Sequence, residues 1–206
     1  AAAPALVKAR TARLFGPPAI ILAVWAGDLL MLGDETGWFS NTWATGQMLA
    51  LNAALALVGL IGGRIVPAFT VNALRRAGRP MELRPLPGVD KGAIAALVAI
   101  VLVDVAMPGG MVAGVLAATA AVLTALRLSR WHGLRTGFEP LVWVMHLAFA
   151  LVPLALALKA AWLLAGPAWA SQWLHMQGAG AIALMILAVM TRATLGHTGR
   201  DLHATP

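Results

Sequence analysis

Long apolar runs constrain the fold of this chain more than any other feature. Several of them reach the roughly 20 residues that an α-helix needs to cross the hydrocarbon core of a bilayer. A membrane β-barrel would show shorter segments of about 10 residues with alternating polarity. The chain is also 60% hydrophobic and only 11% charged, whereas soluble domains contain about 25% charged residues. We therefore predict an all-α, polytopic membrane protein.

Six of these runs are long enough to form transmembrane helices. Proline and glycine separate most of them, and these residues mark turns. The predicted spans cover approximately residues 14–32, 45–67, 91–107, 111–128, 140–164 and 171–195. Residues 14–195 then form one six-helix bundle between two polar tails, residues 1–13 and 196–206. The first run is long and lacks a clear cleavage site, so we expect a retained span rather than a signal peptide.

Lysine and arginine gather in alternate loops of this arrangement. Nearly all of them lie in the two tails and in the loops after the second and fourth spans. Around the other three loops lie Trp38, Trp43, Trp169 and Trp173, which is typical of a membrane interface. Because positive charge is retained on the cytoplasmic side, we predict that both tails are cytoplasmic.

The basic charge and the absence of cysteine limit the partners and the chemistry. Topology and anionic lipid together account for the formal net charge of +7, so we expect the lipid bilayer as partner and no nucleic acid. The chain has no cysteine, which excludes disulfides, thiolate metal sites and cysteine nucleophiles. A metal or haem would have to use histidine, methionine, carboxylate or backbone ligands.

Three charged residues lie inside predicted spans: Asp28, Asp104 and Lys159. An ionisable group at membrane depth is costly and normally faces the bundle interior or water, so each is a functional candidate. A pair between Lys159 and an aspartate would compensate two stranded charges. Alternatively, Lys159 reaches the membrane interface alone. As a set, the three residues could form the polar relay of a transporter or channel.

Histidine and arginine mark the end of the bundle that we predict to be cytoplasmic. The last span carries Arg192 into its final turn and ends in a Gly-His-Thr-Gly-Arg tail that contains His197. His146 lies about seven residues, or roughly 10 Å, from the same end of its own helix. Arg64 lies in the last turn of the second span. We therefore predict an inner site that joins these four residues.

His175 begins the last span from the opposite membrane face. Its depth should differ from that of His146 by roughly 10–15 Å, so the two histidines should not share one metal. The predicted outer site groups His175 with Asp28, Asp104, Lys159 and Gln177.

Three segments carry a distinctive pattern of residues. They read GGRIVPAFT at residues 62–70, PLVWVMHL at 140–147, and HMQGAG through VMTRA to LGHTGR at 175–200. In content and order they resemble the NnrS family, bacterial inner-membrane proteins associated with haem, copper and the response to nitric oxide. Members of that family look about twice as long, with about twelve spans. The chain resembles their C-terminal half.

The resemblance implies haem or copper as cofactor, nitric oxide as a small gaseous ligand, and the bacterial inner membrane as the location. It makes His146 and His175 metal-ligand candidates, and His197, Arg64 and Arg192 further cofactor-binding candidates. The family's Trp-His-Ala-His-Glu-Met motif has no counterpart here, and HMQGAG stands where the family tends to read His-Ala-Leu-Thr-Val-Gly. The pattern predicts no catalytic residue.

Simpler interpretations stay open for each candidate. His146 could bond another helix, the arginines could reach lipid phosphate, and His197 could lie in a solvated helix cap. Two alternative functions also remain. One is a polar-relay transporter or channel, and the other is a half-unit that needs a second half or a second copy to form its sites.

Overall fold

Helices make up the regular structure of the protein. The computed structural model describes residues 16–199, so the predicted tail of residues 1–13 and the end of the second tail, residues 200–206, lie outside the described residues. The long helices are α2 (Gly16–Glu35), α3 (Trp43–Arg76), α4 (Pro87–Ala106), α5 (Met111–Ser129), α6 (Pro140–Ala165) and α8 (Leu184–His197). No strand occurs in the described range, which confirms the all-α prediction.

Four short elements complete the described part of the chain. Two are 3₁₀ turns, η2 (Gly133–Thr136) and η3 (Ala168–Ala170). A single helical turn, α7 (Trp173–His175), leads into a π-helix, η4 (Met176–Ala183), which continues into α8. The last predicted span is therefore one helical segment, but its middle is wound with i→i+5 hydrogen bonds, a form that often marks functional positions.

Five helical segments of the described chain are long and apolar enough to cross a membrane. They are α2, α3, α5, α6 and the segment Ala168–His197, which confirms a polytopic membrane protein. The remaining predicted span, residues 91–107, corresponds to α4, which is as long as α2 but carries Asp90, Lys91 and Asp104. It packs between α3 and α5, where two of these charges find partners in other helices.

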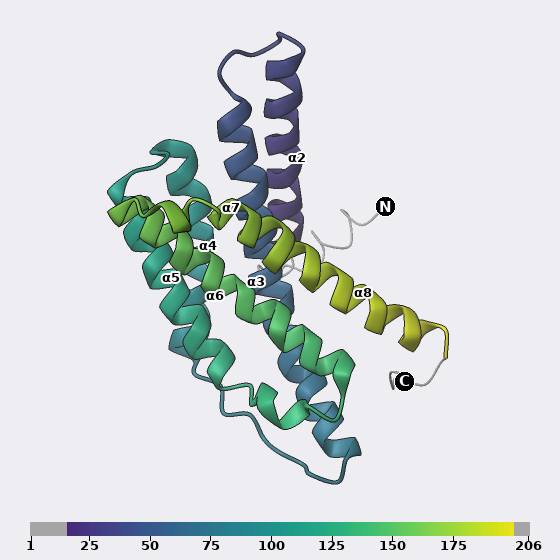
Figure 1. Ribbon diagram of the computed structural model, residues 1–206. Coiled ribbons are helices and arrows are strands. Elements are labelled where there is room, and N and C mark those ends of the chain that lie inside the picture. The colour runs from purple at the N-terminus through teal and green to yellow at the C-terminus, as the bar shows by residue number, and fades with distance from the viewer. Residues whose placement is uncertain (1–15, 200–206) are drawn as a thin grey trace.

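The helices pack in chain order, and α6 lies against several of them. Each of α2 to α6 contacts the next helix, and α6 also contacts α3, η4 and α8. Phe149, Val152 and Leu156 of α6 are fully buried in the shared core. In Figure 1, α2 and the beginning of α3 stand together at one end, whereas α8 runs obliquely away from the bundle.

Glycine allows α2 and α3 to approach closely. A Cβ on Gly27 would lie 2.6 Å from the carbonyl oxygen of Gly46, and a Cβ on Gly46 would lie 2.5 Å from that of Gly27. Such small-residue crossings let helix backbones touch in a membrane.

The helix α3 continues well past its predicted end at residue 67. Pro67 has no N–H, so the carbonyl of Gly63 loses its usual helical donor. The side chain of Arg127 donates to that carbonyl from α5, at 3.1 Å. A tertiary contact therefore supplies the missing hydrogen bond, and the helix runs on to Arg76.

Basic residues gather at one end of the bundle, where α3 ends, α4 begins, α5 ends and α6 begins. We call this the basic end, and it includes Arg75, Arg76, Arg79, Arg84, Arg130 and Arg135. His146, near the beginning of α6, lies at this end as well.

Candidate functional site

His146 is buried in α6 with a side-chain exposure of 7%. Its Nε2 atom lies 2.7 Å from the hydroxyl oxygen of Thr70 on α3. When that hydroxyl donates its single proton to the carbonyl of Val66, at 2.9 Å, it accepts from the imidazole. In that arrangement Nε2 carries the ring proton of His146 and Nδ1 carries the lone pair.

The other ring nitrogen of His146, Nδ1, is buried and has no hydrogen-bond partner among the described residues. A Cβ on Gly133 would lie 2.5 Å from Nδ1, 2.6 Å from Cγ and 3.0 Å from Cε1. These similar distances place Gly133 over the face of the ring rather than along the lone pair in its plane. The turn η2 therefore cradles the imidazole and needs glycine at this position.

A cavity of about 570 Å³ adjoins this histidine between α5, η2 and α6. Both His146 and His132 line it, together with Arg135 and Trp143. His132 is exposed and has a left-handed backbone with φ of 54°, a conformation that is uncommon outside glycine. The sequence places His132 only in a loop, and its shared cavity with His146 becomes visible in the fold. The adjacent Gly133 is the one local signal of a tight approach.

Arg192 is the second buried candidate of the basic end, with 4% exposure. Its guanidinium lies 4.4 Å from the ring centre of Phe69, the neighbour of Thr70 on α3. Its Nη1 atom is buried without a hydrogen-bond partner in the described range. The carboxylate of Glu139, paired with Arg76 at 3.6 Å, is the opposite charge that acts on it. Arg192 and His146 therefore contact adjacent residues of α3.

Arg64 and His197, the other two residues of the predicted inner site, are placed differently. Both side chains are exposed. Arg64 acts electrostatically on Arg127, and His197 is the last residue of α8. Neither joins the contacts that surround His146.

A buried polar network occupies the other end of the bundle. Lys159 of α6 and Asp104 of α4 form an ion pair. Asn52 of α3 donates to Asp104 at 2.6 Å and accepts from Gln177 of η4 at 3.1 Å. The Lys159 ammonium also lies 4.7 Å from the ring centre of Trp173. Five elements, α3, α4, α6, α7 and η4, thus meet around one compensated pair of charges.

The two remaining candidates of the predicted outer site stay outside this network. Asp28 on α2 and His175 on α7 have exposed side chains. Asn52, which the sequence analysis did not single out, is instead the residue that joins the network. Its only sequence signal is an amide in the middle of an apolar run.

The two polar regions are well separated. Lys159 follows His146 by thirteen residues on α6, which corresponds to about 20 Å along the helix axis. Phe149, Val152 and Leu156 lie between them and are fully buried. The stretch of α6 between the two polar regions is therefore apolar.

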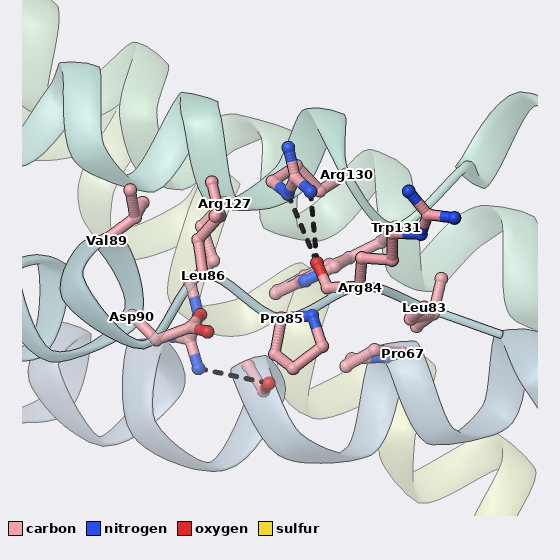
Figure 2. Close-up of a pocket in the computed structure, with 11 residues that line it drawn as sticks. Pro67, Leu83, Arg84, Pro85, Leu86, Val89, Asp90, Arg127, Arg130 and Trp131 are labelled. Carbon is pink, nitrogen blue, oxygen red and sulfur yellow. Dashed lines mark hydrogen bonds and ion pairs between the residues drawn. The ribbon is translucent and has the colours of Figure 1, made fainter.

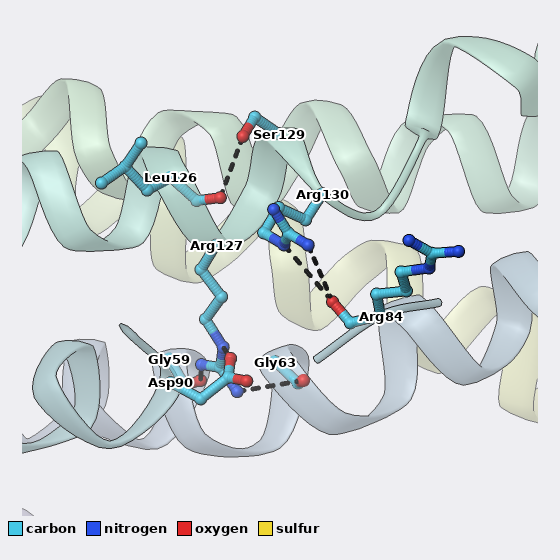
Figure 3. A network of polar contacts seen from close by, with 8 residues as sticks. All are labelled: Gly59, Gly63, Arg84, Asp90, Leu126, Arg127, Ser129 and Arg130. Carbon is cyan, nitrogen blue, oxygen red and sulfur yellow. Dashed lines mark hydrogen bonds and ion pairs between the residues drawn. The ribbon is translucent and has the colours of Figure 1, made fainter. Parts of the chain in front are cut away.

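A third polar region centres on Arg127, which Figure 3 shows. Its Nε donates to Asp90 at 2.7 Å, and its two terminal nitrogens donate to the carbonyls of Gly59, at 2.8 Å, and Gly63, at 3.1 Å. A Cβ on Gly63 would collide with the guanidinium. We call this arrangement the guanidinium clamp. Arg127 is not among the candidates predicted from the sequence, although Pro67 with a glycine four residues earlier signals a carbonyl in need of a donor.

Comparison with known proteins gives one family. The model of the NnrS protein family matches residues 1–206, the whole chain. No curated protein and no solved structure matches it.

Proposed function

Because the chain belongs to the NnrS family along its whole length, we propose that it acts in the bacterial inner membrane in the response to nitric oxide, as a protein that binds haem or copper through His146. Membership of the family supports the nitric-oxide response at the level of the family. The observation that carries the ligand assignment is the buried Nδ1 atom of His146, which has no partner in the described part of the chain.

The residues around His146 fit a metal or a haem iron. Histidine ligands usually donate their other ring N–H to an acceptor, which fixes the tautomer and the ring orientation. The Thr70 hydroxyl is such an acceptor for Nε2. His132 offers a second imidazole at the wall of the same cavity of about 570 Å³. Imidazole is a common ligand of both copper and haem iron.

Each neighbouring residue has a definite task in this proposal. Thr70 orients the imidazole, and Gly133 leaves room for it. Trp131, whose ring centre is 6.3 Å from that of His146, helps to exclude water. Arg192 supplies a buried positive charge with a spare N–H, which suits a carboxylate such as a haem propionate. The bound haem or copper would supply the ligation of nitric oxide.

The exposed candidates have a weaker basis. Roles for His175, His197 and Arg64 in cofactor binding rest on the sequence pattern alone, because their side chains do not join the buried contacts.

Spectroscopy and metal analysis of the purified protein test this proposal. Protein expressed with added haem or copper should retain stoichiometric iron or copper, and haem would give a Soret band that shifts when nitric oxide is added. His146→Ala should abolish this binding, whereas His197→Ala, which removes an exposed imidazole, should leave it intact. Wild-type protein without pigment and without metal would refute the proposal, as would full loading of the His146→Ala variant.

The transporter alternative has less support. A polar relay along α6 would have to cross the fully buried apolar residues between Lys159 and His146. Asp28, the third member of the predicted relay, is exposed on α2 and has no contact with the Lys159–Asp104 pair.

One observation favours a half-unit that pairs with a second half or a second copy. Asp28 is exposed on a helix that is long and apolar enough to span a membrane, and a carboxylate facing lipid is costly. Because the chain has no cysteine, Asp28→Cys gives a single cross-linking site. In native membranes it should form cross-linked products, whereas Leu126→Cys on the exposed face of α5 should not. Monomer alone from both variants would refute this pairing.

A further inference from the structure

A cavity of about 420 Å³ lies beside the guanidinium clamp at the basic end. We propose that it binds the phosphate group of an anionic phospholipid headgroup. Figure 2 shows it between the beginning of α4, the end of α5, the lower part of α3 and the segment that leads into α4. Three arginines line it, Arg84, Arg127 and Arg130, and Asp90 is the carboxylate among its lining residues.

Arg130 is anchored to the segment that carries Arg84. The Nε and Nη2 atoms of Arg130 both donate to the backbone carbonyl of Arg84, at 3.3 Å and 3.1 Å, as the dashed lines in Figure 2 indicate. Asp90 is already engaged by Arg127 in the clamp. Among the described residues, no carboxylate pairs with the guanidinium of Arg84 or of Arg130, so both positive charges are available to an anion at the cavity. Guanidinium groups bind phosphate in a fork geometry.

The position of the cavity indicates a lipid as the source of that phosphate. It lies where α4 begins, at Pro87, and where α5 ends, at Ser129, which is the depth at which membrane helices meet the headgroups. Leu86, Val89 and Trp131 give it apolar walls that suit the glycerol and upper acyl region of a lipid. Anionic headgroups are also the natural partners of basic residues next to a span.

A neighbouring cavity supplies a matched control. It has a volume of about 630 Å³ and is lined by Arg79 and Arg135. These two arginines belong to the same basic end, but neither donates to the backbone of the other in the described structure. Removal of either pair changes the net charge of the protein by the same amount.

Lipid binding to the purified full chain tests the proposal. Native mass spectrometry in a zwitterionic detergent would compare phosphatidylglycerol with phosphatidylcholine of the same acyl chains. We expect wild-type protein to prefer phosphatidylglycerol by at least about tenfold. Arg84→Gln combined with Arg130→Gln should lower that affinity by about tenfold or more, since charge-assisted hydrogen bonds are lost. Arg79→Gln combined with Arg135→Gln should change it by less than about twofold, because surface charge alone contributes little.

Further comparisons distinguish a specific lipid site from a general effect of charge and from a site for free phosphate. Equal losses in both double variants would overturn the site, because they would indicate a general effect of charge, and equal binding of the two lipids would overturn it as well. Inorganic phosphate that binds alone as tightly as phosphatidylglycerol and displaces it would overturn the lipid assignment. Should the Arg84/Arg130 variant fail to fold, Arg84→Gln alone carries the test by the same lipid comparison. The Arg84 guanidinium makes no hydrogen bond in the described structure, so its removal leaves the local fold in place.

Discussion

The buried pair of Lys159 and Asp104 allows a quantitative test of how this bundle is stabilised. Lys159→Met removes the positive partner and leaves the Asp104 carboxylate with one donor, the amide of Asn52 at 2.6 Å. Asp104→Asn removes the negative partner and leaves the ammonium near the Asn52 oxygen, at 3.4 Å, and the ring of Trp173. Each single substitution strands one charge in the core.

Burial sets the size of the expected effect. Both side chains are almost completely buried, and removal of one member of such a pair costs about 3–5 kcal/mol because the other charge is left uncompensated. Lys159→Met should lie at the lower end, since the charge-assisted bond from Asn52 still contributes about 1.5–3 kcal/mol. Replacement of both residues, as Lys159→Met with Asp104→Leu, should cost far less than either single change, because apolar replacement of a buried pair is often neutral.

Unfolding of the protein in detergent micelles measures this cycle. Tryptophan fluorescence would report the midpoint for wild type, the two single variants, Asp104→Leu alone and the double variant, all at the same detergent concentration. The reasoning requires the double variant to be more stable than the Lys159→Met and Asp104→Leu variants. If the losses of those two variants simply add in the double variant, the two charges do not depend on each other and the reasoning is refuted.

Three glycine positions give further predictions. Gly63→Ala should displace the guanidinium clamp and lower the free energy of unfolding by about 3 kcal/mol. Gly88→Ala, where a Cβ meets open space, should have little effect. Thermal unfolding measures both variants, and equal melting temperatures would contradict the prediction. Gly133→Ala should displace the imidazole of His146 and weaken metal or haem binding by about 10–100-fold. Gly137→Ala is the control, because a Cβ there meets open space. Unchanged metal or haem loading of the Gly133→Ala variant would show that η2 does not position the imidazole. Gly46→Ala should separate α2 from α3 and increase hydrogen exchange of α2 amides in nanodiscs, and unchanged exchange would count against the close crossing.

The positions of the helices follow from the sequence because the membrane imposes a length and the turns are marked by proline and glycine. Two features could not be predicted in this way. The extension of α3 through Pro67 depends on a donor that comes from Arg127, far along the chain. The π-helix Met176–Ala183 has no local signal that separates it from an α-helix. An apolar pattern contains a signal for neither.

The candidate residues divide according to which face of a helix they occupy. Sequence position predicts depth, and depth is what places His146 apart from the pair of Lys159 and Asp104 in the prediction. An apolar helix gives no pattern that indicates which side faces the core, so Arg64 could not be distinguished from a buried arginine. The buried arginine next to it is Arg127, which reaches α3 from another helix.

The polar atoms that remain unpaired differ in kind between the two ends of the bundle. At the end with Lys159, the two charges compensate each other, and the atom left over in the described structure is an amide oxygen of Gln177. At the basic end, a ring nitrogen of His146 and an N–H of Arg192 are left over. A buried polar group without a partner costs about 1–3 kcal/mol. The cost is higher in a membrane, where no water is present to form the missing hydrogen bond. A lone pair that can bind a metal and a cation that can bind a carboxylate are the two groups that a haem requires, so this end of the bundle, and not the ion-pair network, is where we expect the cofactor.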